Sequence, residues 1–148
     1  LAGTAQTING VTTPDVVRAA TGDVILGVVV GINPTSRDTL GYGAASTAYT
    51  LFVDDDPNSL FEVQDVNSGT ALTVNDVGLN ANFVVAAGST YTNQSGTTLD
   101  NTTEATTNTL DLKLVEVVNR ADVDNASSPL RFLVRINRHQ FSNQVAGV

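Results

Sequence analysis

The chain has 148 residues, of which 41% are hydrophobic and only 15% are charged, with a formal net charge of -8. This composition is too apolar for a disordered chain and too poor in Lys and Glu for a helical bundle. Cysteine is absent, which excludes disulfides and thiolate metal sites. The length fits one domain with a substantial core, and the abundant Thr, Asn, Ser, Gly and Val favour strands and turns.

Residues 1–21 are small and polar, and we predict that they form an extended N-terminal arm. Asn9-Gly10 is a turn signal, and Thr12-Thr13-Pro14 favours extended backbone. The best helical candidate in the chain, at 13–20, is short. An arm of this kind either frays or reaches a neighbouring molecule, and the pattern does not decide between the two.

Residues 22–141 are predicted to form the folded domain, and residues 142–148 a polar tail. Within the domain, about seven or eight short strand-forming stretches alternate with turn signals. This pattern is typical of an all-β protein, and we predict an antiparallel β-sandwich or barrel. The expected strands lie at 24–30, 47–53, 60–66, 71–74, 79–87, 97–100, 110–118 and 129–139.

The first expected strand, at 24–30, is apolar on both faces instead of alternating. One face of an antiparallel sheet is usually in contact with water. We therefore expect the outer face of this strand to be covered by a loop, a second sheet or another subunit, which makes Val28 and Val30 candidate partner contacts. Gly27 and Gly31 are predicted to permit close backbone approach or to mark bulges.

Aromatic residues within the expected strands are predicted to form the core rather than a ligand platform. They are Tyr49, Phe52, Phe61, Phe83 and Phe132.

Three adjacent acids, Asp54-Asp55-Asp56, follow the second expected strand. A calcium loop spaces its ligands along the chain, whereas contiguous carboxylates diverge. We therefore interpret these acids as part of a structural turn. The polar segment at 88–109 is long enough to be either functional or flexible, and a short strand at 97–100 is predicted to interrupt it.

The last two strands are predicted to pair antiparallel around a roughly ten-residue polar loop. Along the second of them, Phe132, Val134 and Ile136 alternate with polar and basic residues, which predicts an apolar inner face and a cationic outer face. The residues predicted to point outward from the pair are Asp111, Lys113, Arg131, Leu133, Arg135 and Asn137.

Five of the seven basic residues fall between Lys113 and Arg138. The simpler interpretation is a solvated sheet face of mixed charge. The alternative is a contact face for an acidic protein surface, with Arg131, Arg135 and Arg138 as candidate partner contacts. Nucleic acid is not an expected partner, because the aromatic residue among these arginines, Phe132, falls on the opposite face of the strand and cannot stack bases beside them.

No catalytic motif is recognisable, and we expect neither an enzyme nor a bound cofactor or metal. His139 is the only histidine, so a multi-histidine metal site is excluded, and its position at a strand end favours a polar structural role. Neither Ser-x-x-Lys nor Gly-x-Ser-x-Gly is present. No apolar run approaches the roughly 20 residues that span a bilayer, so a membrane partner is not expected.

Several stretches, taken in order, resemble a family of small structural proteins of tailed bacteriophages, the cement or decoration proteins of capsid shells. The resemblance implies a jelly-roll-like or related β fold, a dimer or trimer, and binding to the major capsid protein on the outer surface of the virion. The stretches are GDVILGVVVG at 22–31, YTLFVDDDP at 49–57, LFEVQ at 60–64, DVGLNA at 76–81 and LVRINRHQ at 133–140.

Two other functions remain open at this point. One is a tail or head-fibre module of the same kind of particle. The other is a carbohydrate-binding β-sandwich, although an aromatic content of 5% leaves few rings to stack on a sugar.

Overall fold

The computed structural model describes residues 6–8, 10–34, 37, 42–43, 47–66, 68–121 and 129–148. Across these residues the chain is all-β, with several antiparallel sheets and one short 3-10 helix, η1 (Val74–Asp76). The all-β class predicted from the sequence is therefore confirmed. The sheets are not closed into a barrel.

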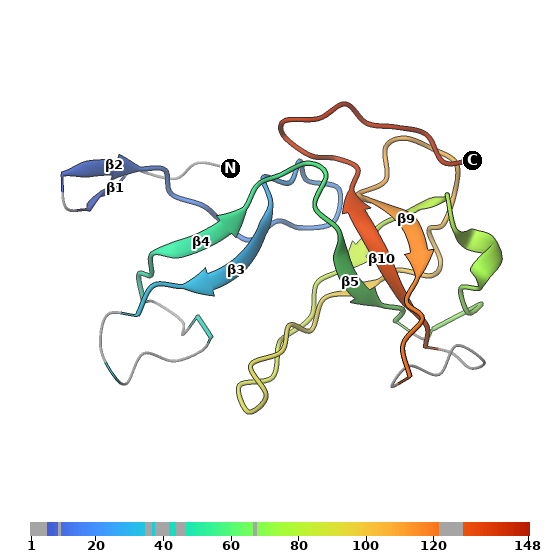
Figure 1. The fold of residues 1–148 in the computed structure, drawn as a ribbon, viewed down its shortest axis with the longest axis horizontal. Coiled ribbons are helices and arrows are strands. Elements are labelled where there is room, and N and C mark those ends of the chain that lie inside the picture. The colour runs from blue at the N-terminus through green and yellow to red at the C-terminus, as the bar shows by residue number, and fades with distance from the viewer. Residues whose placement is uncertain are drawn as a thin grey trace.

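The body of the molecule is a four-stranded sheet in the order β5–β10–β9–β6 (Figure 1). Its strands are β5 (Phe61–Gln64), β10 (Arg131–Ile136), β9 (Leu112–Val117) and β6 (Asn80–Ala81), and all three pairings are antiparallel. The predicted pairing of the last two strands is thus confirmed. Of the loop between them, residues 122–128 lie outside the described part of the chain.

One face of this sheet carries the core. Phe132, Val134 and Ile136 of β10 are buried, whereas the intervening Arg131 and Leu133 are only partly covered, as the alternation predicts. A two-stranded sheet, formed by β7 (Phe83–Val84) and β8 (Thr98–Leu99), contributes Phe83 and Leu99 to the same core. Each fully buried side chain of this size contributes about 1.5–3 kcal/mol relative to an exposed one.

Two of the predicted strands differ in the structure. Leu72 is buried, but the chain at 71–74 does not form a strand, because Thr73 and Asp76 form a capping box that turns it into η1. The expected strand at 79–87 is divided at Asn82. Its backbone N–H donates to the Thr103 hydroxyl at 3.0 Å, and its carbonyl accepts from the Asp100 N–H.

A separate two-stranded sheet, which we call the ribbon, consists of β3 (Val28–Ile32) and β4 (Leu51–Asp54). Before β3, Ile25 bridges to His139 at the end of the central sheet. The N-terminal arm forms a hairpin from β1 (Gln6–Ile8) and β2 (Val11–Thr13), with Gly10 at a φ of +80°. Figure 1 shows this hairpin apart from the body, beyond the ribbon. The short helical candidate at 13–20 is not formed.

The predicted aromatic core is only partly correct. Phe132 and Phe83 are buried and Phe61 packs against them. Tyr49 is only half-buried, and Phe52 on the ribbon is 55% exposed. Phe52 therefore does not belong to the core, because the ribbon that carries it is not part of the central sheet.

Two residues predicted to point outward are in fact buried. Asn137 is 2% exposed and Asp111 is fully buried. In both places other segments of the chain cover the sheet: residues near Val145 lie over Asn137, and residues near Gly22 lie over Asp111. Alternation along a strand indicates the direction of a side chain but not what packs on top of it.

Both the acidic stretch that begins at Asp54 and the polar segment at 88–109 contain hydrogen-bonded turns. In the acidic turn, the Asp54 carboxylate accepts from the Asp56 N–H and the Ser59 hydroxyl, and the Asp56 carboxylate accepts from the Asn58 N–H. The predicted structural turn is confirmed. The segment at 88–109 contains the predicted short strand, β8, and a tight turn closed by a hydrogen bond from the Ser89 N–H to the Gln94 carbonyl.

Candidate interaction surface

The close pairing of the ribbon depends on glycine. A Cβ at Gly27 would lie 2.1 Å from the Asp54 carbonyl oxygen, so no other residue fits there without moving the backbone. The register shifts between Val29 and Gly31, which leaves Val30 without a cross-strand partner. Such a bulge bends a strand and re-aims its side chains. Both roles predicted for the glycines, close approach and bulge, are therefore present at this strand.

The ribbon exposes a continuous run of apolar side chains. Val28, Val29 and Val30 are 36%, 50% and 64% exposed, and Phe52 on the paired strand is also exposed. No charged residue occurs in β3, and β4 carries only Asp54 at its end. A two-stranded ribbon is marginal in water unless one face is packed. The two candidate partner contacts from the sequence, Val28 and Val30, are thus both exposed on this ribbon.

An apolar groove of about 580 Å³ continues this surface toward the body. One wall is the chain leading into the ribbon, residues 16–29. The opposite wall is the inner face of the central sheet and of β7, and its lining residues are Phe61, Val63, Phe83, Val85, Leu112, Val134 and Ile136. Phe83, Leu112, Val134 and Ile136 on this wall are buried, so the groove ends against a covered core, and its exposed apolar lining lies on the side of Val24, Val28 and Val29.

The three candidate arginines separate into two groups. Arg131 lies on the outer face of β10 and pairs with Glu62 at 3.1 Å, and Arg120 pairs with the same carboxylate. Arg135 lies on the same face, opposite Lys113 of β9. Arg138 is instead directed to the buried Asp111. The sequence did not indicate the role of Glu62, because the pairing of β5 with β10 cannot be read from alternation alone.

The outer face of the central sheet is cationic although the whole chain is acidic. It carries four basic side chains and two carboxylates among the described residues: Lys113, Arg120, Arg131, Arg135, Glu62 and Glu116. The Glu62 ion pairs are exposed, so each contributes at most about 1 kcal/mol. This face therefore carries a net positive charge that could contact an acidic surface. Breaking the Glu62 ion pairs to make such a contact would cost little stability.

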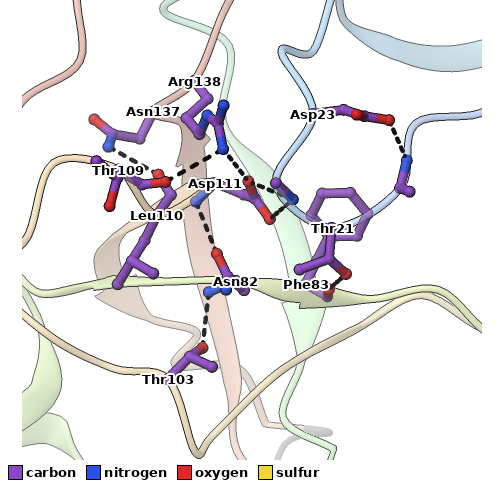
Figure 2. Close-up of polar contacts among 12 residues, drawn as sticks. Thr21, Asp23, Asn82, Phe83, Thr103, Thr109, Leu110, Asp111, Asn137 and Arg138 are labelled. Atoms are coloured by element: carbon purple, nitrogen blue, oxygen red, sulfur yellow. Dashed lines mark hydrogen bonds and ion pairs between the residues drawn. The ribbon is translucent and has the colours of Figure 1, made fainter.

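A buried polar cluster around Asp111 fixes the segment that precedes the ribbon, at Thr21 and Gly22, to the body (Figure 2). Both Asp111 carboxylate oxygens accept from the Gly22 N–H at 3.1 Å, and Arg138 lies 3.9 Å away. The adjacent Thr21 hydroxyl donates to the Phe83 carbonyl at 2.7 Å. Burial raises the pKa of Asp111 above its ordinary value, and the Gly22 hydrogen bond and the Arg138 charge only partly oppose this. The chain is thus fixed at Gly22, six residues before β3, while Val28, Val29 and Val30 of the ribbon remain exposed.

The only histidine has a structural position. His139 is buried at the end of β10, where its Nδ1 accepts from the Phe141 N–H at 3.0 Å. Within the described residues, no three His, Cys, Asp or Glu side chains gather closely enough to hold a metal ion. The described part of the chain also contains no helix with the length and apolar character that crossing a bilayer requires.

No family model, curated protein or solved structure matches this chain.

Proposed function

We propose that this chain is a virion structural protein, a cement or decoration protein that self-associates and binds the major capsid protein across neighbouring capsomers. The observation that carries the proposal is the apolar ribbon, with Val28, Val29 and Val30 exposed beside an open groove. A contiguous apolar surface on a folded protein indicates a partner.

The apolar ribbon and the basic face of the sheet together suit a protein that binds a shell through many repeated weak contacts. The ribbon offers an uncharged surface to another copy, which matters because copies with a net charge of -8 repel one another elsewhere. The outer face of the central sheet offers basic side chains to an acidic wall. Weak contacts of both kinds, repeated over a shell, add by avidity.

We further propose that assembly completes the sandwich or jelly-roll-like arrangement expected from the sequence. In a single chain the central sheet is covered on its inner face, whereas Val28, Val29, Val30 and Phe52 of the ribbon remain exposed. A second layer supplied by another copy, in a dimer or trimer, would cover the ribbon. The expected place of action is the outer surface of the capsid.

The first test is self-association measured by sedimentation velocity at micromolar concentration. The chain is expected to form a dimer or trimer, and the double variant Val28→Thr/Val30→Thr is expected to sediment as a monomer. A matched control is Val74→Thr/Val115→Thr, which changes two exposed valines that lie outside the ribbon. A monomeric wild type, or variants that behave alike, would contradict the role of the ribbon.

The second test is co-sedimentation with empty capsids. Binding is expected to be lost in Arg131→Glu/Arg135→Glu, while the control Arg18→Glu/Arg37→Glu makes the same charge change outside this sheet. Circular dichroism checks that each variant keeps its fold. Failure of the wild type to bind capsids would exclude a cement protein. Labelling at the tail would favour a tail or head-fibre module, and specific binding on a glycan array would favour a carbohydrate-binding module.

A further inference from the structure

The last residues of the chain lie in a slot built from polar side chains of the central sheet. The Val145 N–H donates to the Asn137 side-chain oxygen at 2.9 Å, and the Val145 carbonyl accepts from the Asn80 side-chain amide at 2.8 Å. The Lys113 ammonium donates to the Ala146 carbonyl at 3.1 Å. Asn80 and Asn137 are 0% and 2% exposed. Buried amides positioned in this way recognise peptide backbone rather than side chains.

Two further hydrogen bonds fix the register of this segment. The Gly147 N–H donates to the Thr106 carbonyl at 2.8 Å, and the Val148 N–H donates to the Gly78 carbonyl at 3.1 Å. A Cβ on Gly147 would lie 3.0–3.1 Å from the Leu79 Cα and from two carbonyl oxygens. A side chain at this position would require the surrounding backbone to shift by a few tenths of an ångström, so the slot favours glycine there.

The segment in the slot is not part of the apolar core. The buried core cluster contains no residue beyond Ile136, and residues 140–146 are exposed. If the segment left, the sheet would keep its core, but the Asn137 oxygen would lose the partner that the structure gives it. Water would replace the peptide at these groups, so release of the segment costs little, and an identical segment from another copy makes the same hydrogen bonds.

We propose that this slot binds the segment 143–148 as a separable peptide, and that it takes the segment from a second copy of the chain as well as from its own. Exchange of an identical element makes the same contacts between copies that it makes within one, so its cost is small. The link is distinct from the apolar ribbon, and it would give neighbouring copies a second, polar connection.

The test uses the full chain with its own segment released by Gly147→Val. A fluorescent peptide of residues 143–148 is expected to bind this variant at least about tenfold more tightly than it binds the wild type, whose own segment competes at a high effective concentration. The same peptide carrying Gly147→Val is expected not to bind. The peptide carrying Ala146→Val is expected to bind normally, because Ala146 is exposed and contributes only its carbonyl.

A second measurement tests exchange between chains. Tagged Gly147→Val chain, with an open slot, is expected to capture untagged wild type more strongly than it captures untagged Gly147→Val, since only the wild type can donate a fitting segment. Association through the ribbon is equal in both pairs, so it cannot produce this difference. Should Gly147→Val misfold, Val145→Pro releases the segment by removing the N–H that Asn137 accepts.

Three results would overturn the proposal: no saturable peptide binding to the released variants, equal binding of the Gly147→Val and Ala146→Val peptides, or equal capture of both untagged chains. A difference in capture that persists in a Val28→Thr/Val30→Thr background would support it even if the ribbon proved not to mediate association.

Discussion

The central sheet and the ribbon are both antiparallel and both rich in valine and leucine, but they differ in how much of their apolar side chains is exposed. In the central sheet, Leu114, Phe132 and Val134 have no exposed surface. In the ribbon, Val30 and Phe52 are more than half exposed. The difference arises from packing: β7, β8 and the loops around them cover the sheet, whereas Val28, Val29, Val30 and Phe52 of the ribbon remain exposed.

This contrast indicates which part of the sequence serves the fold and which serves a partner. Alternation in β10 produces a face that the chain itself buries. The continuous apolar run in β3 produces a surface that one chain leaves open. Variants in the two regions should therefore affect different quantities, the free energy of unfolding in one and association in the other.

The largest effect is expected from matched phenylalanine truncations. Phe132→Ala removes a fully buried ring and is expected to lower the free energy of unfolding by about 3–5 kcal/mol. Phe52→Ala removes an exposed ring and is expected to change it by less than about 1 kcal/mol in the monomer while weakening self-association. Urea denaturation and sedimentation measure the two effects. Equal destabilisation would mean that the ribbon belongs to the core.

A smaller effect is expected where the segment that precedes the ribbon is fixed to the body. Gly22 has a φ of +84°, a conformation that costs other residues roughly 1–2 kcal/mol. Gly22→Ala is therefore expected to lower the free energy of unfolding by about that amount. Gly43→Ala, at a site with open space and no positive φ, serves as the control. Denaturation curves that overlap for the two variants would argue against the anchoring role.

The Asp111 cluster predicts a pH dependence of stability. Because burial raises the pKa of folded Asp111 above its ordinary value, folding favours its protonated form. Its contribution to stability is therefore fully present below about pH 4 and is lost as pH rises through the raised folded pKa. Compared with Asp111→Asn, which does not titrate, the wild type is expected to be relatively most stable at low pH. A relative stability that increases with pH would show that Gly22 and Arg138 outweigh burial.

The smallest effect is expected on the outer face. Glu62→Gln breaks two exposed ion pairs and is expected to change the free energy of unfolding by no more than about 1 kcal/mol. The same change removes a negative charge from beside Arg131 on this face, so binding to an acidic capsid surface should strengthen. Weaker capsid binding would mean that Glu62 positions Arg131 for the contact.

Several features could be predicted from the sequence because they depend on local pattern. Period-two alternation located β10 and its buried face, and adjacent acids marked the turn at Asp54. The pattern in 24–30 also indicated a two-faced apolar strand. Its extent was less accurate, since β3 begins only at Val28.

Other features depend on contacts between distant segments, which alternation does not encode. The burial of Asn137 depends on a segment near Val145, and the burial of Asp111 depends on Gly22. The division of the strand at Asn82 results from a hydrogen bond to Thr103. Such long-range partners are polar, and their sequence signals resemble those of ordinary surface residues.

Backbone hydrogen exchange, measured by mass spectrometry over a range of protein concentrations, tests the central claim most directly. If the ribbon is an adhesion surface between copies, peptides covering β3 and β4 should become protected as concentration rises, while those covering β9 and β10 remain equally protected throughout. Protection of the ribbon that does not change with concentration, in a protein that stays monomeric, would contradict the account.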